Sequence, residues 1–254
     1  MGTRGWHPSQ NDFMVIKYSD KFESIFYAIL YGNINNLAKE NICHILISKN
    51  EPQVLLSKEI NIDIDQLNPQ EILQSHDNKF GEINWYNNKN NKFIEFRQFI
   101  DFSFRYWHPY KYKIIIETIK QAIKYGLNYL YNMPTQEFTE LINITNEIKK
   151  EMNSAQGSIK FIPLARDRFK FLIGSYREEN KICDLIINLL QNKYFGYNIL
   201  LRTNKVIFFL YQNQLFQIPL ERFNFEINTK NFEKFWDDFY NNIFLPKEER
   251  INLI

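Results

Sequence analysis

The chain has 254 residues, of which 44% are hydrophobic and 24% are charged, and this composition excludes an intrinsically disordered protein. Its formal net charge of +2 excludes a histone-like polycation but leaves room for a local basic surface. The length allows one large domain or two small ones.

The first half of the chain, residues 14–132, is predicted to mix strands and helices behind a flexible leader of residues 1–13. Alternating or continuous apolar runs predict strands, whereas apolar residues at three- and four-residue spacing predict helices. We expect strands at residues 14–18, 42–48 and 60–64, a helix from about residue 20 to residue 31, a surface loop over residues 74–92, and a helix whose apolar stripe runs from Ile116 to Leu130 and ends at Asn132.

An aromatic segment from Phe93 to Tyr112 allows two interpretations. Its rings at position 93 and at positions 96, 99, 102, 104, 106, 107, 110 and 112 fit an aromatic helix packed into a core. Arginines and lysines lie between the rings, so the segment also fits a platform on which nucleic-acid bases stack. A third use is a surface that docks a partner protein.

The second half, residues 133–254, changes period several times. The pattern predicts helices near residues 134–152, 182–190 and 231–244, and strands at residues 158–164, 168–173, 197–202, 206–211 and 215–220. A hairpin, a helix, a three-strand meander and a helix in this order indicate an α+β fold. We expect an antiparallel sheet with helices packed on one face, preceded by a smaller α/β N-terminal half. The two halves could also form one continuous domain.

No familiar catalytic or cofactor motif occurs in the sequence. Glycine-rich phosphate loops, the nucleophile elbow and the zinc-deaminase pattern are all absent. The two cysteines, Cys43 and Cys183, have no metal-ligand spacing, and we expect both to be free buried thiols. We therefore expect no cofactor and no metal, and a binding role is favoured over an enzyme with an unfamiliar active site.

No apolar run approaches the 18 or so residues that a membrane-spanning helix needs, and residues 1–12 lack the apolar centre of a signal peptide. We expect a cytoplasmic protein with no membrane partner.

One segment is strongly basic. Between Lys149 and Lys205 there are eleven lysines and arginines against five acidic residues. Such a surface can pair with phosphates, although any half-exposed sheet also needs polar residues on its outer face. The candidate nucleic-acid contacts are Lys160, Arg166, Arg168, Lys170 and Arg202.

Three stretches of the chain resemble a bacterial family of DNA-metabolism proteins. Tyr18–Ile29 (YSDKFESIFYAI) is similar to the family's Y-D-G-S-F-E-G-x-L-x-A-I/V start. Glu151–Phe161 (EMNSAQGSIKF) resembles its E-x-H-x-M-x-G-x-V-R-F stretch, and Phe232–Asn252 resembles its W-x-x-Y/F-x-x-x-I-x-I-x-x-R-x-N ending. Asn153 and Ala155 stand where the family has histidine and methionine.

The resemblance implies a role beside another enzyme. Members of the family are encoded beside a radical-SAM protein of the DNA-repair type, and the same domain of unknown function occurs fused ahead of uracil-DNA-glycosylase-like domains. We therefore expect an accessory DNA-binding protein with such a partner. The alternatives are a repair enzyme with a pocket for a flipped base, formed by Glu151, Asn153 or Asn180, and a protein-interaction module.

Overall fold

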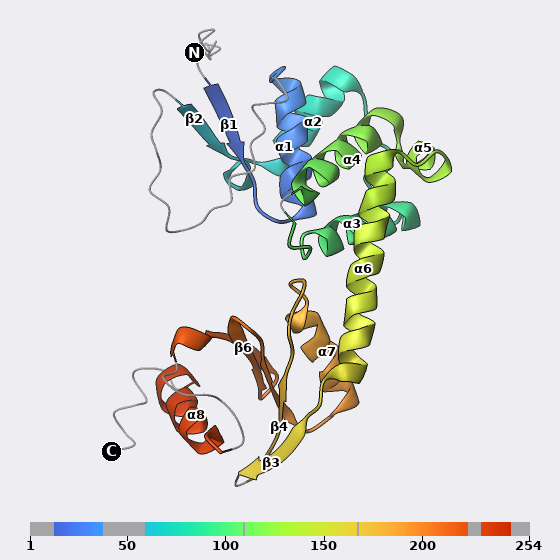
Figure 1. Cartoon of the computed structure of the whole chain (residues 1–254). Helices are drawn as coiled ribbons and strands as arrows, with labels where there is room; N and C mark the ends of the chain where they lie inside the picture. The colour runs from blue at the N-terminus through green and yellow to red at the C-terminus, as the bar shows by residue number, and fades with distance from the viewer. Residues whose placement is uncertain (1–12, 38–58, 109, 167, 223–229, 245–254) are drawn as a thin grey trace. The chain divides into compact units, whose positions relative to one another are not determined.

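The computed structural model describes residues 13–37, 59–108, 110–166, 168–222 and 230–244 (Figure 1). The chain divides into two compact units, an N-terminal unit of residues 1–146 and a C-terminal unit of residues 147–254. The boundary falls within helix α6 (Gln136–Ser158), whereas the sequence places it before that helix, between residues 132 and 133. One helix therefore contributes residues to both units.

Two short strands and a set of helices make up the N-terminal unit. Strand β1 (Phe13–Lys17) pairs in parallel with β2 (Glu59–Asp63). Both strands lie within one residue of predicted ones, but their pairing is not predicted from the sequence. The helices are α1 (Phe22–Ile34), the 3-10 turn η2 (Ile64–Gln66), α2 (Pro69–Phe80), α3 (Asn91–Ser103), α4 (Lys111–Tyr125), α5 (Leu127–Asn132) and the first part of α6.

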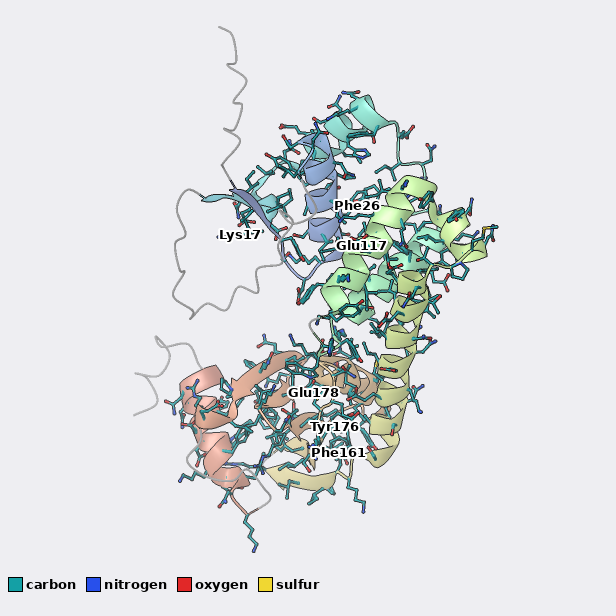
Figure 2. The ribbon with its side chains drawn as sticks, turned by 45° about the horizontal axis from the view of Figure 1, so that its top comes forward. Lys17, Phe26, Glu117, Phe161, Tyr176 and Glu178 are labelled. Carbon is teal, nitrogen blue, oxygen red and sulfur yellow. The ribbon has the colours of Figure 1, made fainter. Side chains whose placement is uncertain are left out.

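Aromatic rings from α1 and α3 form the core of this unit. Phe22 and Phe26 of α1 and Phe96 of α3 have no exposed surface. The ring centroid of Phe22 lies 5.6 Å from that of Phe93 and 6.1 Å from that of Phe96, and Phe26, labelled in Figure 2, stacks on Tyr86 at 4.5 Å. These are the edge-to-face and stacked arrangements that aromatic cores favour.

The aromatic segment from Phe93 to Tyr112 belongs mainly to this core. Phe93, Phe96, Phe104 and Tyr112 are buried, and only Trp107 and Tyr110 are more than 40% exposed. The buried ammonium of Lys111 donates to the carbonyl oxygens of Phe104 and Tyr106 at 2.5 and 2.6 Å, so it fixes the turn between α3 and α4. The structure of this segment is that of a core helix and the turn after it.

The predicted surface loop over residues 74–92 is wrong at both ends. Helix α2 extends to Phe80, and α3 begins at Asn91. Asparagines next to these helices act as caps: the side chain of Asn68 accepts from the N–H of Gln70 at 3.1 Å, and that of Asn90 accepts from Lys92 at 3.0 Å.

The predicted helix that ends at Asn132 is divided into two. Gly126 has a φ of 81°, which ends α4 and begins α5. This backbone conformation favours glycine because any side chain would be strained there. The predicted strand at residues 42–48 and the leader up to residue 12 lie outside the described residues, as do Cys43 and His44.

A five-stranded sheet forms the centre of the C-terminal unit. Its strands lie in the order β3 (Ile162–Arg166), β4 (Phe169–Ser175), β5 (Asn198–Arg202), β6 (Val206–Tyr211) and β7 (Gln214–Pro219). Helix α7 (Cys183–Lys193) connects β4 to β5, and the 3-10 turn η3 (Leu220–Arg222), helix α8 (Phe232–Phe239) and the π-helical turn η4 (Tyr240–Phe244) follow β7.

The α+β fold class is confirmed, with two differences in detail. The β4–β5 pair is parallel, since α7 carries the chain back across the sheet, whereas the other three pairs are antiparallel. The N-terminal unit is mostly helical and is the longer of the two, not the smaller.

Helices cover both faces of the sheet, whereas the sequence suggests one face (Figure 1). Alternate strand residues point to opposite faces. One set packs with α8: Phe171, Ile173, Leu200, Ile207, Phe209, Tyr211 and Ile218 contact Phe232, Phe235, Trp236 and Phe239. Residues of the other set, such as Leu172, Ile199 and Leu201, are also buried, and α7 contacts β5 and β6. We call the two sides of the sheet the α8 face and the α7 face.

The first strand of the predicted hairpin is displaced. The sequence predicts this strand at residues 158–164, but α6 continues to Ser158 and β3 covers Ile162–Arg166. Pro163 is tolerated because β3 is an edge strand, where a missing N–H leaves no partner unpaired.

In the part of the chain that the structure describes, no helix has the length and apolar character needed to cross a bilayer.

Candidate nucleic-acid interface

The five basic residues suggested by the sequence do not share one surface. Arg166 of β3 lies opposite Phe169 and therefore on the α8 face. Lys170 of β4 lies opposite Ala165, on the α7 face. Strand alternation thus separates side chains that the sequence places only four residues apart.

Arg166 is neutralised by helix α8. Its Nη1 lies 2.7 Å from a carboxylate oxygen of Glu233, and its Nη2 lies 3.0 Å from one of Asp237. The guanidinium also lies 6.0 Å from the ring centroid of Trp236. A guanidinium held between two carboxylates has little net charge left for a phosphate, so this arginine docks α8 against the sheet.

Arg168 and Arg202 also lie apart from Lys170. Arg168 is exposed beside the β3–β4 turn, with its guanidinium 5.2 Å from the ring centroid of Phe169. Arg202 ends β5 and is half-buried, and its carbonyl oxygen accepts from the N–H of Tyr176 at 2.9 Å.

Lys170, one of the predicted contacts, lies in a group of lysines and aromatic residues. The sequence reasoning did not identify this group. Its ammonium lies 5.9 Å from the ring centroid of Tyr197, and the ammonium of Lys193 lies 5.3 Å from that of Tyr194. The ring of Tyr194 in turn lies 5.8 Å from the ring of Phe161. We call Phe161, Lys170, Lys193, Tyr194, Phe195 and Tyr197 the lysine–aromatic patch.

Phe195 is the most distinctive member of the patch. Its side chain is 93% exposed, more than any other large hydrophobic residue in the described ranges. It lies at the tip of a tight turn between α7 and β5, in which Gly196 has a φ of 83° and the N–H of Tyr197 donates to the carbonyl oxygen of Tyr194 at 3.2 Å. The turn keeps this apolar ring in contact with water, although burying such a side chain would be favourable by about 2 kcal/mol.

The patch is supported from beneath by Gly174 of β4. A Cβ at this position would lie 2.8 Å from the ring of Phe161, so only glycine leaves room for that ring on the α7 face. Lys160, which was expected to contact nucleic acid, precedes Phe161 and is exposed.

Acidic residues are absent from the sequence around the turn. No aspartate or glutamate occurs between Asp184 and Glu221, and none between Glu151 and Asp167. The lysines at positions 160 and 193 therefore lie on stretches of chain without neighbouring carboxylates, unlike Arg166.

The predicted pocket residues are brought together in part. Oε1 of Glu151 accepts hydrogen bonds from the hydroxyl of Tyr176 at 2.9 Å, the N–H of Glu179 at 3.0 Å and the N–H of Asn180 at 3.2 Å. Its Oε2 accepts from the side-chain amide of Asn180 at 2.7 Å. Asn153 is exposed on α6 and does not join this group in the structure. Tyr176 is labelled in Figure 2.

These contacts make Glu151 a clamp rather than a catalytic base. Three donors share Oε1 and one donor binds Oε2, so both oxygens of the Glu151 carboxylate are engaged in hydrogen bonds within the fold. Burial and the neighbouring Glu151 charge raise the pKa of Tyr176, so its hydroxyl remains a donor. The clamp fastens the β4–α7 connection to the second half of α6.

Glu178 and Cys183 have structural places at the start of α7. Oε1 of Glu178 accepts from the N–H groups of Ile182 and Cys183 at 2.8 and 3.1 Å, which satisfies two donors at the helix start. Burial and the Glu178 charge raise the pKa of the Cys183 thiol, which favours its protonated form. Within the described ranges, no three histidine, cysteine or acidic side chains are grouped so as to hold a metal ion.

The patch could have been recognised from its local sequence. The segment 193–197 (KYFGY) lies between a predicted helix and a predicted strand. Its aromatic residues follow neither the helical nor the strand period, so neither element accounts for their burial. The sequence pattern assigned Tyr197 to the strand and left Phe195 unexplained.

The sequence pattern of a family described as a domain of unknown function, DUF4130, matches residues 109–254, more than half of the chain. No protein of curated function matches. A solved structure described as a member of a family of ribosomal proteins, with a DHH domain, is 7% identical. Its match covers 90% of this chain and 79% of that one, with a TM-score of 0.34. A likeness this low carries no argument about fold or function.

Proposed function

The chain belongs to the DUF4130 family, whose function is unknown, and we propose that it is a cytoplasmic accessory protein that binds single-stranded DNA through its C-terminal unit. The observation that carries this proposal is the lysine–aromatic patch, in which the 93% exposed ring of Phe195 lies in a turn beside Lys193 and two tyrosines.

An exposed ring between cations matches the chemistry of single strands. Each unstacked base has an aromatic face that can stack on a protein ring, which is worth about 1–3 kcal/mol per base. Lysine ammoniums beside the ring pair with the phosphates that flank the base. Duplex DNA keeps its bases stacked on one another, so the same patch favours single strands.

The clamp around Glu151 supports an accessory role over a catalytic one. Both oxygens of the carboxylate already accept hydrogen bonds from the fold, and burial raises the pKa of the Cys183 thiol. Neither group offers a base or a nucleophile to a bound strand.

The resemblance to DNA-metabolism proteins extends the proposal to a partner. A DNA-binding accessory protein would deliver or hold strands for an enzyme of DNA metabolism or repair, here a radical-SAM or uracil-DNA-glycosylase-like protein. Co-purification of this chain with such an enzyme, at a fixed stoichiometry, would support this part of the proposal, and failure to associate would remove it.

Fluorescence anisotropy of a short labelled oligothymidylate, titrated with the protein over a salt series, tests the binding itself. With Lys160, Lys170 and Lys193 each releasing about one counterion, log K should fall with log salt with a slope of about −2. The triple change of these lysines to glutamine should abolish most of this slope, while Lys89→Gln, an exposed lysine of the N-terminal unit, should leave it unchanged. No binding at low salt, or binding indifferent to salt, contradicts the proposal.

A further inference from the structure

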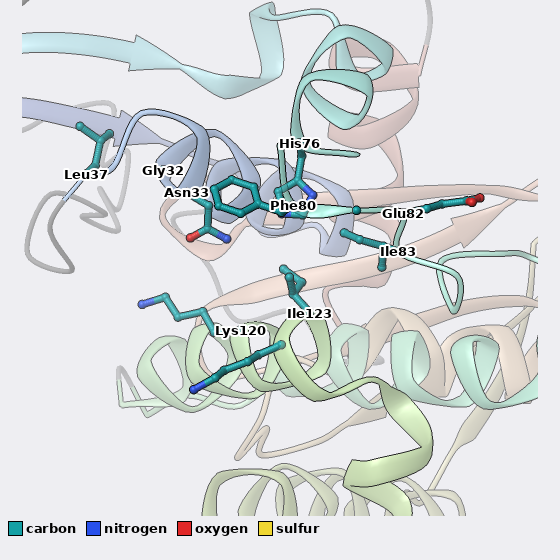
Figure 3. A pocket seen from close by; sticks show the side chains of 11 residues that line it. Gly32, Asn33, Leu37, His76, Phe80, Glu82, Ile83, Lys120 and Ile123 are labelled. Carbon is teal, nitrogen blue, oxygen red and sulfur yellow. The ribbon is translucent and has the colours of Figure 1, made fainter. Parts of the chain in front are cut away.

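A pocket of about 470 Å³ lies within the N-terminal unit, apart from the lysine–aromatic patch and the Glu151 clamp (Figure 3). Its size falls in the range of small-molecule sites, about 300–1,000 Å³. Helix α2 provides His76 and Phe80 on one side, and α4 provides Lys120, Ile123 and Lys124 on the other. Asn33 at the end of α1 and Ile83 in the loop after α2 also line it.

His76 is a buried histidine with one unsatisfied ring nitrogen. Its side chain is 3% exposed, and its Nδ1 has no hydrogen-bond partner in the described part of the chain. The nearest acid, Asp77, lies 3.8 Å away through Oδ1, which is too far for a hydrogen bond. Burial lowers the pKa of His76, so at neutral pH the ring is an uncharged donor and acceptor. Leaving such a group unsatisfied is costly, which favours a ligand that completes it.

Phe80 supplies an aromatic surface at the same wall. Its ring is 52% exposed and lies 5.0 Å from the ring of His76. The ammonium of Lys79 lies over this ring, 5.1 Å from its centroid, and donates to the carbonyl oxygen of Ile34 at 2.8 Å. Phe80 therefore lines the pocket with a half-exposed ring.

The opposite wall carries positive charge. Lys120 and Lys124 lie one helical turn apart on α4, so their side chains share a face. Lys120 is paired with Glu117 at 3.2 Å. Lys124 is exposed, and its ammonium lies 4.8 Å from the ring centroid of Tyr125. Glu82 is the one acidic lining residue in the described part of the chain, and Figure 3 shows its carboxylate directed away from Phe80 and Lys120.

We propose that this pocket binds a small aromatic anion of the nucleoside monophosphate class. The base stacks on Phe80, the carboxamide of Asn33 and the imidazole of His76 meet its polar edge, and Lys124, with Lys120, holds the phosphate. A carboxamide and a neutral imidazole both offer the donors and acceptors that base edges require. The site lies in a different unit from the lysine–aromatic patch and takes a free ligand, so it does not depend on the proposed DNA binding.

Isothermal titration of the full chain with adenosine 5′-monophosphate, adenosine and inorganic phosphate tests the proposal. We expect saturable binding of the monophosphate and weaker binding of each fragment. Equal affinity for phosphate alone, equal affinity for adenosine alone, or no saturable binding of the monophosphate overturns it.

Variants at the two walls separate the contribution of the lysine charge from that of the aromatic surface. Lys124→Gln should weaken the monophosphate about tenfold and leave adenosine unchanged, as expected for one charge-assisted hydrogen bond. Phe80→Ala should weaken both nucleoside ligands about tenfold through the lost stacking surface. Lys113→Gln and Tyr129→Ala, exposed in the same unit but outside the pocket, are the matched controls.

Both wall residues are exposed, so the variants should keep the wild-type thermal transition. If the wall variants bind the monophosphate as tightly as the controls do, the pocket is not its site and the proposal is wrong. Oligothymidylate binding by the same variants should remain unchanged, which separates this result from any failure of the DNA-binding proposal.

Discussion

Two segments of this chain combine aromatic rings with basic side chains, and the structure treats them in opposite ways. In the segment from Phe93 to Tyr112 the rings of α3 recur with helical spacing, four of the nine rings in the segment are buried, and only Trp107 and Tyr110 are exposed. In the segment from Lys193 to Tyr197 the rings follow one another through a turn, and Phe195 is left 93% exposed. This contrast shows that periodicity, and not composition, decides whether an aromatic cluster is buried or left on the surface.

The largest expected effect lies in the buried segment. Phe96→Ala removes a ring with no exposed surface that contacts Phe22 at 6.1 Å, and it should lower the free energy of unfolding by about 3–5 kcal/mol. Ile94→Ala, 40% exposed on the same helix, should change it by less than about 0.5 kcal/mol. Urea denaturation measures both, and a similar small loss for the two variants would refute a core role for this segment.

The second effect concerns the clamp that holds the connection before α7. Glu151→Gln replaces a charged acceptor of four hydrogen bonds and should cost about 1–3 kcal/mol of stability. Oligothymidylate affinity of the folded variant should stay at the wild-type value. A loss of binding without a loss of stability would instead make Glu151 part of the DNA site.

Phe195→Ala should weaken oligothymidylate binding by about as much free energy as Glu151→Gln costs in stability. It should not change the stability of the fold. Loss of one stacked base costs about 1–3 kcal/mol, or roughly fivefold in affinity at the lower end. Because the side chain is exposed, the thermal transition should not fall. Tyr129→Ala, an exposed aromatic change in the N-terminal unit, is the control. If it weakened oligothymidylate binding as much as Phe195→Ala does, the assignment of binding to Phe195 would be wrong.

The smallest effect distinguishes the two faces of the sheet. Lys170→Gln should make the slope of log K against log salt shallower by about 0.7, the share of one phosphate contact on a single strand. Arg166→Gln should leave the slope unchanged, because Glu233 and Asp237 already neutralise that guanidinium. Anisotropy titrations at four or more salt concentrations measure both, and the reverse order of effects would place the interface on the α8 face.

Much of the fold followed from periodicity in the sequence. Alternation and helical spacing predicted α1, α7, α8 and the strands β4 to β7 to within a few residues. The break at Gly126 was missed, because the apolar stripe continues through it and only the backbone conformation ends the helix. The parallel β4–β5 pair was also missed, since strand pairing is a tertiary property that local patterns do not determine.

The candidate sites were less accessible to sequence reasoning. A count of charges placed Arg166 and Lys170 in one cluster, but strand alternation and the acids of α8, about seventy residues further along the chain, separate them. Glu151 and Asn180 do meet, as the sequence suggested, but only the structure shows that both oxygens of the carboxylate are engaged in hydrogen bonds. The pocket beside His76 arises from α1, α2 and α4 together and leaves no local signal.

Photo-cross-linking to an oligothymidylate that contains 5-iodouracil, followed by peptide mass spectrometry, tests the contrast between the two segments most directly. Both segments offer exposed rings, Trp107 and Tyr110 in one and Phe195 in the other. We expect cross-links confined to residues 194–197 and lost in Phe195→Ala. Cross-links on Trp107 or Tyr110 in place of residues 194–197 would contradict the assignment of the DNA-binding surface to the lysine–aromatic patch.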